Sequence, residues 1–113
     1  MQGLALLILV ALLSILIVLV GLYQTRYSDP YVRQVLNLSG DPVQGQAIFQ
    51  MNCTSCHGIN ADGHVGPSLH DISDRKSRVG LIKQVISGNT PPMPQFQPST
   101  QEMSDLLSYL ETL

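Results

Sequence analysis

The chain has 113 residues and a formal net charge of −2, enough for one small domain with an appendage. This charge argues against nucleic acid as a partner, because nucleic acid attracts strongly basic surfaces. Two phenylalanines, four tyrosines and no tryptophan provide few large side chains for a core. We therefore expect something other than the domain's own side chains to fill part of its centre.

Residues 4–22 are almost entirely apolar, with Ser14 as the single polar residue. At about 1.5 Å per residue this run approaches the ~30 Å thickness of a bilayer's hydrocarbon core. We predict a transmembrane anchor at residues 1–23. The alternative is a secretory signal peptide, which would want a basic flank and a small-residue cleavage site that residues 1–24 do not show.

Residues 24–40 are predicted to form a juxtamembrane linker that contains one short helix. Asp29 followed by Pro30 is typical of an N-cap and the first position of a helix. This helix would run to about residue 38, and its apolar side would carry Val32, Val35, Leu36 and Leu38. Such a segment would set the height of the following domain above the bilayer.

Aromatic and basic residues flank the apolar run on its C-terminal side. Tyr23, Tyr27 and Tyr31 recur at every fourth position, as aromatics at a membrane interface do, although a surface linker would also tolerate them. Arg26 and Arg33 follow the run, and no basic residue precedes it. By the positive-inside rule alone, the domain after the anchor would lie in the cytoplasm.

The domain proper is predicted to span residues 41–113 and to open with a helix. Asp41 is a suitable N-cap, Pro42 suits the first helical position, and Gln44 stands where a capping box needs it. Apolar residues follow at helical spacing, and we expect them to form the buried side: Val43, Ala47, Ile48 and Met51. The helix leads directly into Cys53.

Residues 53–57 read Cys-Thr-Ser-Cys-His, the C-x-x-C-H pattern that attaches a c-type haem. Cys53 and Cys56 lie on one helical turn, so both thiols can reach one edge of a porphyrin, and His57 can turn an imidazole nitrogen toward the iron. A redox dithiol, half of a zinc site and a plain disulfide are the alternatives. We predict one haem c, covalently attached through Cys53 and Cys56 with His57 as the proximal ligand.

Two further helices follow a glycine-rich loop at residues 58–66. The first is predicted to begin near Ser77 and to stop at Gly88. The second opens at Ser99, with Glu102 as its capping-box partner. Their apolar positions are Val79, Ile82, Val85 and Ile86 in the first, and Met103, Leu106, Leu107 and Leu110 in the second. No segment alternates as a strand does, so the fold class is all-α.

The domain resembles the class I c-type cytochromes. The residues that match are Gly45 and Phe49 in the first helix, Leu106 and Tyr109 in the last, and the turn Gly66-Pro67-Ser68-Leu69. The resemblance implies that the first and last helices cross at this contact. It also implies that the Pro67 carbonyl accepts the Nδ1–H of His57 and that Leu69 packs on the porphyrin.

The whole chain also resembles the cytochrome cM family of cyanobacteria. The matching features are the apolar N-terminal run, the segment Ser28-Asp29-Pro30-Tyr31-Val32 and the run Thr90-Pro91-Pro92-Met93-Pro94. This resemblance implies a thylakoid or plasma membrane setting.

The class I resemblance places the distal iron ligand in the proline-rich loop, at Met93. The flanking prolines stiffen that loop. Met51 and Met103 fit apolar helix faces better, whereas His64 and His70 are rival ligands, with His70 the stronger of the two. Methionine–histidine ligation would raise the reduction potential and leave no open position at the iron.

Four basic residues lie close together in the sequence: Arg75, Lys76, Arg78 and Lys83. They would either solvate a helix start and offset Asp71 and Asp74, clamp a haem propionate, or steer an acidic redox partner. The sequence does not choose among these roles.

Together these features predict a membrane-anchored electron carrier, and not an enzyme, with redox proteins as donor and acceptor and no small-molecule substrate. Haem attachment to C-x-x-C-H takes place beyond an energy-coupling membrane, which favours a lumenal or periplasmic haem domain and conflicts with the arginine count. A haem sensor or a regulatory subunit of a larger membrane complex is the alternative. A peroxidase would also need an open iron position and a distal acid or base.

Overall fold

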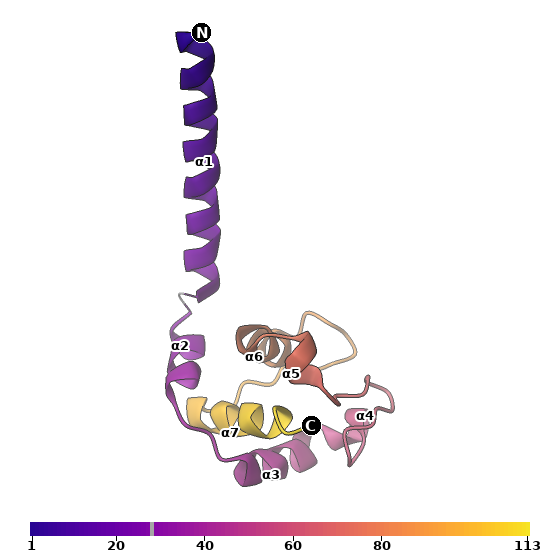
Figure 1. Cartoon of the computed structure of the whole chain (residues 1–113). Coiled ribbons are helices and arrows are strands. Elements are labelled where there is room, and N and C mark those ends of the chain that lie inside the picture. The colour runs from indigo at the N-terminus through magenta and orange to yellow at the C-terminus, as the bar shows by residue number, and fades with distance from the viewer. Residues whose placement is uncertain (28) are drawn as a thin grey trace. The chain divides into compact units, whose positions relative to one another are not determined.

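The computed structural model describes residues 1–27 and 29–113, except for the side chains of Arg26 and Tyr27. The described chain divides into two compact units, Met1–Pro30 and Tyr31–Leu113. Its helices are α1 (Gln2–Tyr27), α2 (Pro30–Asn37), α3 (Pro42–Asn52), α4 (Thr54–His57), α5 (Ile72–Arg75), α6 (Arg78–Ser87) and α7 (Thr100–Leu110), and the described residues form no strand. The predicted all-α class is confirmed (Figure 1).

Helix α1 forms the first unit. Its segment Gln2–Thr25 is long and apolar enough to cross a membrane, a test that a signal sequence near an N-terminus also passes. Its leucine, isoleucine and valine side chains are exposed along the whole helix. The predicted aromatic row includes Tyr27, the basic flank includes Arg26, and the cyanobacterial resemblance includes Ser28; these three positions lie outside the described side chains.

Helix α2 is the predicted short helix, and it packs into the second unit. Val32 and Val35 are fully buried in the core, whereas Leu38 is 37% exposed. The Tyr31 hydroxyl donates to the Pro98 carbonyl at 2.9 Å, and Ser104 Oγ donates to the Leu38 carbonyl at 3.2 Å. Because of this packing, the compact unit begins at Tyr31, inside the predicted linker of residues 24–40.

The N-terminus of α3 is capped differently from the prediction. The Asp41 carboxylate accepts the backbone N–H of Val43 at 2.9 Å, as an N-cap should. The predicted capping box, in which the Gln44 side chain accepts the backbone N–H of Asp41, is wrong. That N–H donates instead to Asp105 Oδ1 at 2.8 Å, because α7 brings the buried Asp105 carboxylate against the start of α3.

The buried side of α3 also differs from the prediction. Val43 and Met51 are 69% and 77% exposed, whereas Gly45 and Phe49 are buried. Of the four predicted residues, only Ile48 packs partly against the core. The prediction missed Gly45, because a glycine contributes little to an apolar pattern even where a neighbouring helix packs directly onto it.

Helices α3 and α7 make the most extensive helix–helix contact of the second unit (Figure 1). A Cβ on Gly45 would collide with the backbone carbonyl of Asp105 and lie 2.8 Å from Cβ of Tyr109. One turn further along α3, the rings of Phe49 and Tyr109 pack with their centroids 5.3 Å apart. The glycine therefore permits the close approach, and the aromatic pair fills the adjoining space.

The predicted caps of α6 and α7 are confirmed. Ser77 accepts the N–H of Gly80 at 3.1 Å, and Gly88 ends α6 in the left-handed region with φ of 65°. Ser99 and Glu102 form a complete capping box at the start of α7. The short helix α5 has no counterpart among the predicted elements.

Replacing Gly45 with alanine is expected to lower the free energy of unfolding by at least about 2 kcal/mol, because the added methyl group meets backbone that cannot move aside easily. Urea titration of the purified protein measures this change. Gln46→Ala, on the exposed side of the same helix, is the matched control and should change stability little. Equal stability of the two variants would contradict the close crossing.

Candidate haem site

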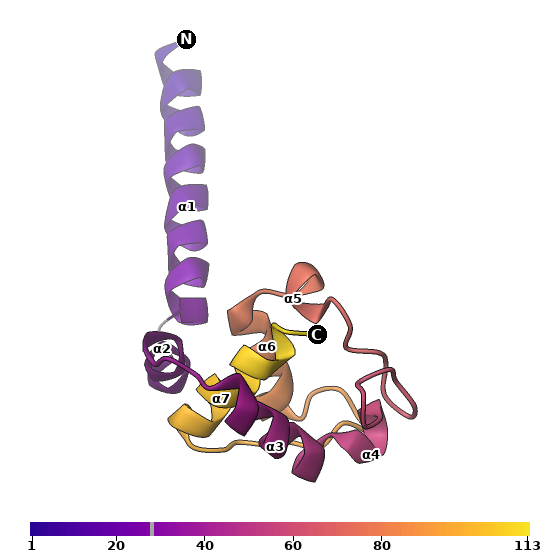
Figure 2. The same cartoon turned by 60° about the horizontal axis from the view of Figure 1, so that its bottom comes forward.

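The C-x-x-C-H residues lie where α3 ends and α4 begins. Cys53 is the C-terminal cap of α3, and its carbonyl accepts the N–H of His57 at 2.9 Å. Cys53 and Cys56 are half-buried and are not joined in a disulfide. Figure 2 shows α4 continuing from the end of α3 before the chain loops out toward α5. The α3–α7 crossing therefore positions both cysteines.

The imidazole of His57 is fixed by one hydrogen bond and by one glycine. Its Nδ1 lies 2.8 Å from the Pro67 carbonyl oxygen, which can only accept. Nδ1 therefore carries the proton, and the lone pair of Nε2 is available to a metal. Gly66 lies flat against the ring, since a Cβ there would be 2.7 Å from Cε1 of His57.

A cavity of about 430 Å³ opens beside His57. Each of the six residues predicted to contact the cofactor lines it: Cys53, Cys56, His57, Pro67, Leu69 and Met93. The remaining lining is largely apolar and comes from α3, α4, residues 65–76, α6, α7 and the 90–96 loop. The volume falls within the range of roughly 300–1,000 Å³ that cofactor pockets occupy.

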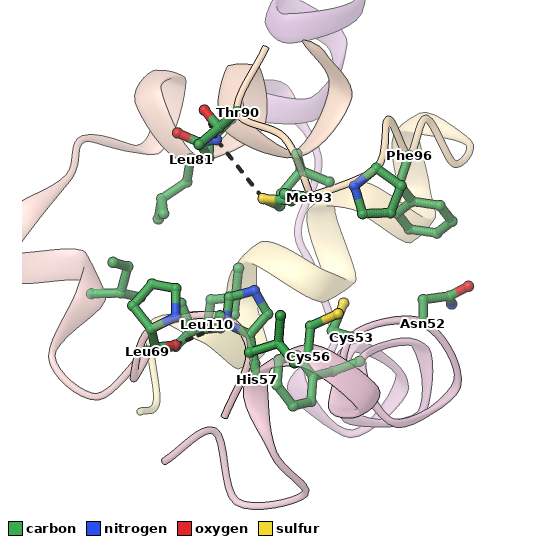
Figure 3. Close-up of a pocket in the computed structure, with 18 of the residues that line it drawn as sticks. Asn52, Cys53, Cys56, His57, Leu69, Leu81, Thr90, Met93, Phe96 and Leu110 are labelled. Carbon is green, nitrogen blue, oxygen red and sulfur yellow. Dashed lines mark hydrogen bonds between the residues drawn. The ribbon is translucent and has the colours of Figure 1, made fainter. Parts of the chain in front are cut away.

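Met93 lies across the cavity from His57. Figure 3 shows the Met93 sulfur on one side, with the His57 ring, Cys53 and Cys56 on the other. The rival histidines are not among the lining residues, and both are exposed. His70 instead places Nε2 2.7 Å from Oδ1 of Asp62.

Burial, followed by the neighbouring Cys56, raises the pKa of the free Cys53 thiol to about 11. The site therefore disfavours a thiolate at this position. A thioether carries no ionisable proton, so the same burial costs it nothing electrostatically. At neutral pH the free thiol of Cys53 stays protonated, and a thioether at this position would be equally compatible with burial.

Sequence reasoning missed part of the cavity wall. Three residues of α6 line the cavity: Leu81, Gln84 and Val85. Of these three, only Val85 was among the predicted apolar positions of the helix. Gln84 and Val85 follow Leu81 by three and four residues, so all three lie on one side of the helix. A polar residue between two apolar ones on that side was the signal in the sequence that could have indicated the cavity wall. Leu106 and Leu110 of α7 were predicted as core, and they line the cavity as well.

Two of the four residues of the basic cluster bind other groups of the protein. Arg75 donates to the carbonyls of Ser68 and His70, at 3.2 and 2.9 Å, and Arg78 pairs with Glu111 at 2.8 Å. Lys76 alone of the four lines the cavity. A role of the basic cluster in binding a haem propionate or an acidic redox partner stays a prediction.

These residues fit a covalently bound haem. The sulfurs of Cys53 and Cys56 lie on one helical turn, and the Nε2 lone pair of His57 is available to a metal. An apolar cavity adjoins these residues, and the Met93 sulfur lies on its far side. Among the described residues, no group of three His, Cys, Asp or Glu side chains could hold a metal ion, so the two cysteines have no partners for a zinc site.

Comparison with known proteins agrees with this reading of the site. Residues 40–110 match the family described as "Cytochrome C oxidase, cbb3-type, subunit III". The chain is 57% identical over 102 residues to the "Cytochrome c-553-like" protein of Synechocystis sp., covering 90% of this chain and 97% of that protein. It is 29% identical over 101 residues to cytochrome c2 of Rhodopila globiformis, covering 66% of this chain and 94% of that protein.

A shorter similarity links the chain to a subunit of an oxidase. Over 52 residues it is 40% identical to the "Cbb3-type cytochrome c oxidase subunit CcoP" of Rhodobacter capsulatus, which covers 41% of this chain and 18% of that protein. The matched family and the full-length similarity agree with the site: this chain belongs to the class I c-type cytochromes and carries one haem c on Cys53 and Cys56.

Proposed function

We propose that this cytochrome is a membrane-anchored carrier of single electrons between redox complexes of a photosynthetic or respiratory chain. The observation that carries the proposal is a cavity with a potential iron ligand on each side, His57 and Met93. Bound haem c supplies a one-electron iron couple, which methionine–histidine ligation shifts to higher potential. The residues around the haem then determine which ligands and reactions the iron admits.

His57 is proposed as the proximal ligand. The Pro67 carbonyl holds the Nδ1 proton, which fixes the tautomer and makes Nε2 a stronger donor. Gly66 and the buried surroundings limit rotation of the ring. Leu69, on the cavity wall beside Pro67, is proposed to pack against the porphyrin.

Met93 is proposed as the distal ligand. The placement of its sulfur across from His57, and the absence of His64 and His70 from the cavity lining, support this choice. A filled distal position excludes oxygen, peroxide and carbon monoxide, and the apolar walls keep water away. Both effects favour electron transfer over catalysis at this site.

Helix α1 is proposed as a retained anchor that places the haem domain in a lumen or periplasm. Gln2–Thr25 would extend for roughly 36 Å, longer than the ~30 Å hydrocarbon core. Confinement to a membrane raises the effective concentration of the carrier near membrane-bound donors and acceptors. Attachment of haem c beyond the membrane favours this side, whereas the count of flanking arginines favours the cytoplasm.

A haem-bearing subunit or sensor within a larger complex is a second candidate, favoured by the oxidase subunit in the description of the matched family. The coverage of relatives argues against it. The chain spans 97% of the "Cytochrome c-553-like" protein, whereas it spans only 18% of the CcoP subunit. A sensor would also need an open distal position.

Met93→Ala is expected to lower the reduction potential by on the order of 0.1 V or more, within the ~0.8 V that axial ligands span. Its reduced form should bind carbon monoxide, and that of the unaltered protein should not. Redox titration and visible spectra measure both effects. Met51→Ala, at a position 77% exposed and outside the cavity, is the matched control. A Met93→Ala protein with the parent's potential and no carbon monoxide binding would refute the distal assignment.

Retention of α1 predicts that the haem-staining protein stays in membranes after alkaline carbonate extraction and keeps its N-terminal residues. Two lysines at the centre of the helix, Leu12→Lys and Leu13→Lys, should weaken this retention, because each costs about 2.5–3.5 kcal/mol in the bilayer. Protease added to sealed vesicles reports the side of the haem domain. Release of a soluble protein that lacks α1 would identify the helix as a signal sequence.

A further inference from the structure

We propose that the side-chain amide of Gln84 holds the Met93 thioether in its ligating position, which makes Gln84 a positioning residue for the distal ligand. This inference rests on the proposed role of Met93. It is drawn from the contacts between α6 and the loop that follows it.

Gln84 is the polar member of an otherwise apolar stretch of cavity wall. It lies on α6 with Leu81 one turn before it and Val85 directly after it, and all three line the cavity. The Gln84 side chain is half-buried, so its amide hydrogens need acceptors within the protein. Leu81 and Ile82 are buried and fix the helix that carries it.

The Gln84 amide nitrogen has two acceptors in the 90–96 loop. Nε2 lies 3.0 Å from Oγ1 of Thr90 and 3.8 Å from Sδ of Met93. Figure 3 marks the hydrogen bond that ends at the Met93 sulfur with a dashed line. One NH₂ group has two hydrogens, so a single amide serves both acceptors.

These two acceptors stand at opposite ends of one backbone turn. The N–H of Met93 donates to the Thr90 carbonyl at 2.9 Å, which closes the turn, and Gln84 then binds a side chain from each end of it. The thioether is therefore held by α6 as well as by its own proline-rich loop. The stiffness of prolines alone would fix the backbone of Met93 but not its sulfur.

The bond to sulfur has a chemical consequence as well as a structural one. A thioether sulfur has two lone pairs, and a hydrogen bond to one leaves the other for a metal. The amide hydrogen also places a partial positive charge beside the ligand, which favours the state of lower charge. Gln84 should thus secure Met93 against competing ligands and raise the reduction potential.

The test compares imidazole binding to the oxidised full-length holoprotein, because imidazole must displace Met93 to bind. Gln84→Leu removes the donor, and Gln84→Asn keeps an amide that is too short to reach the sulfur. Both are expected to bind imidazole about fivefold more tightly and to show a lower reduction potential. Gln97→Leu, at an exposed position directly after the 90–96 loop and outside the cavity, is the matched control.

The outcomes separate this inference from the proposed function. Variants of Gln84 whose imidazole affinity and potential stay with those of Gln97→Leu would overturn the role of Gln84 alone. If the unaltered protein binds imidazole as tightly as Met93→Ala does, Met93 is not the ligand and both proposals fail. If Gln84→Leu does not accumulate as holoprotein, the measurement on Gln84→Asn decides.

Discussion

The close crossing of α3 and α7 at Gly45 is the constraint on which the rest of the haem domain depends. It brings the Asp105 carboxylate to the N-terminus of α3 and the Phe49 ring onto Tyr109. It also sets the direction in which α3 delivers Cys53. The same α7 contributes Leu106 and Leu110 to the cavity wall, so one contact orients both the covalent attachment point and the apolar surface facing it.

Around that crossing, the imidazole of His57 is held in the tautomer that a bound haem requires. An acceptor-only carbonyl keeps the proton on Nδ1 of His57, and burial of Cys53 disfavours the thiolate. Because the domain has few large side chains of its own, we expect a haem in this cavity to form part of the core. On this expectation, function and stability depend on the same cofactor.

Local chemistry made much of the fold predictable from the sequence. The caps at Asp41, Ser77 and Ser99 depend on short-range hydrogen bonds, and all three were found where their residue types indicated. The buried side of α3 was not predictable from hydrophobicity, because a close crossing selects a glycine. The sequence of α2 revealed a helix but not its burial, since that depends on Pro98 and Ser104, more than 60 residues away.

The haem site likewise contains residues that local motifs predict and one contact that they do not. The C-x-x-C-H pattern is local, and the Gly-Pro-x-Leu and proline-rich segments carried a family resemblance, so the cavity-lining residues Pro67, Leu69 and Met93 were named in advance. The bond from Gln84 to the Met93 sulfur joins a helix to a loop and has no motif of its own. Contacts of this kind emerge only when the chain is folded.

Mass spectrometry of the purified protein under denaturing conditions addresses the covalent haem most directly. The mature polypeptide should carry the mass of one haem after acid–acetone extraction, and one proteolytic peptide containing Cys53 and Cys56 should retain it. A polypeptide without added mass, with both cysteines open to alkylation, would contradict the haem attachment that underlies the site, the core and the proposed electron transfer.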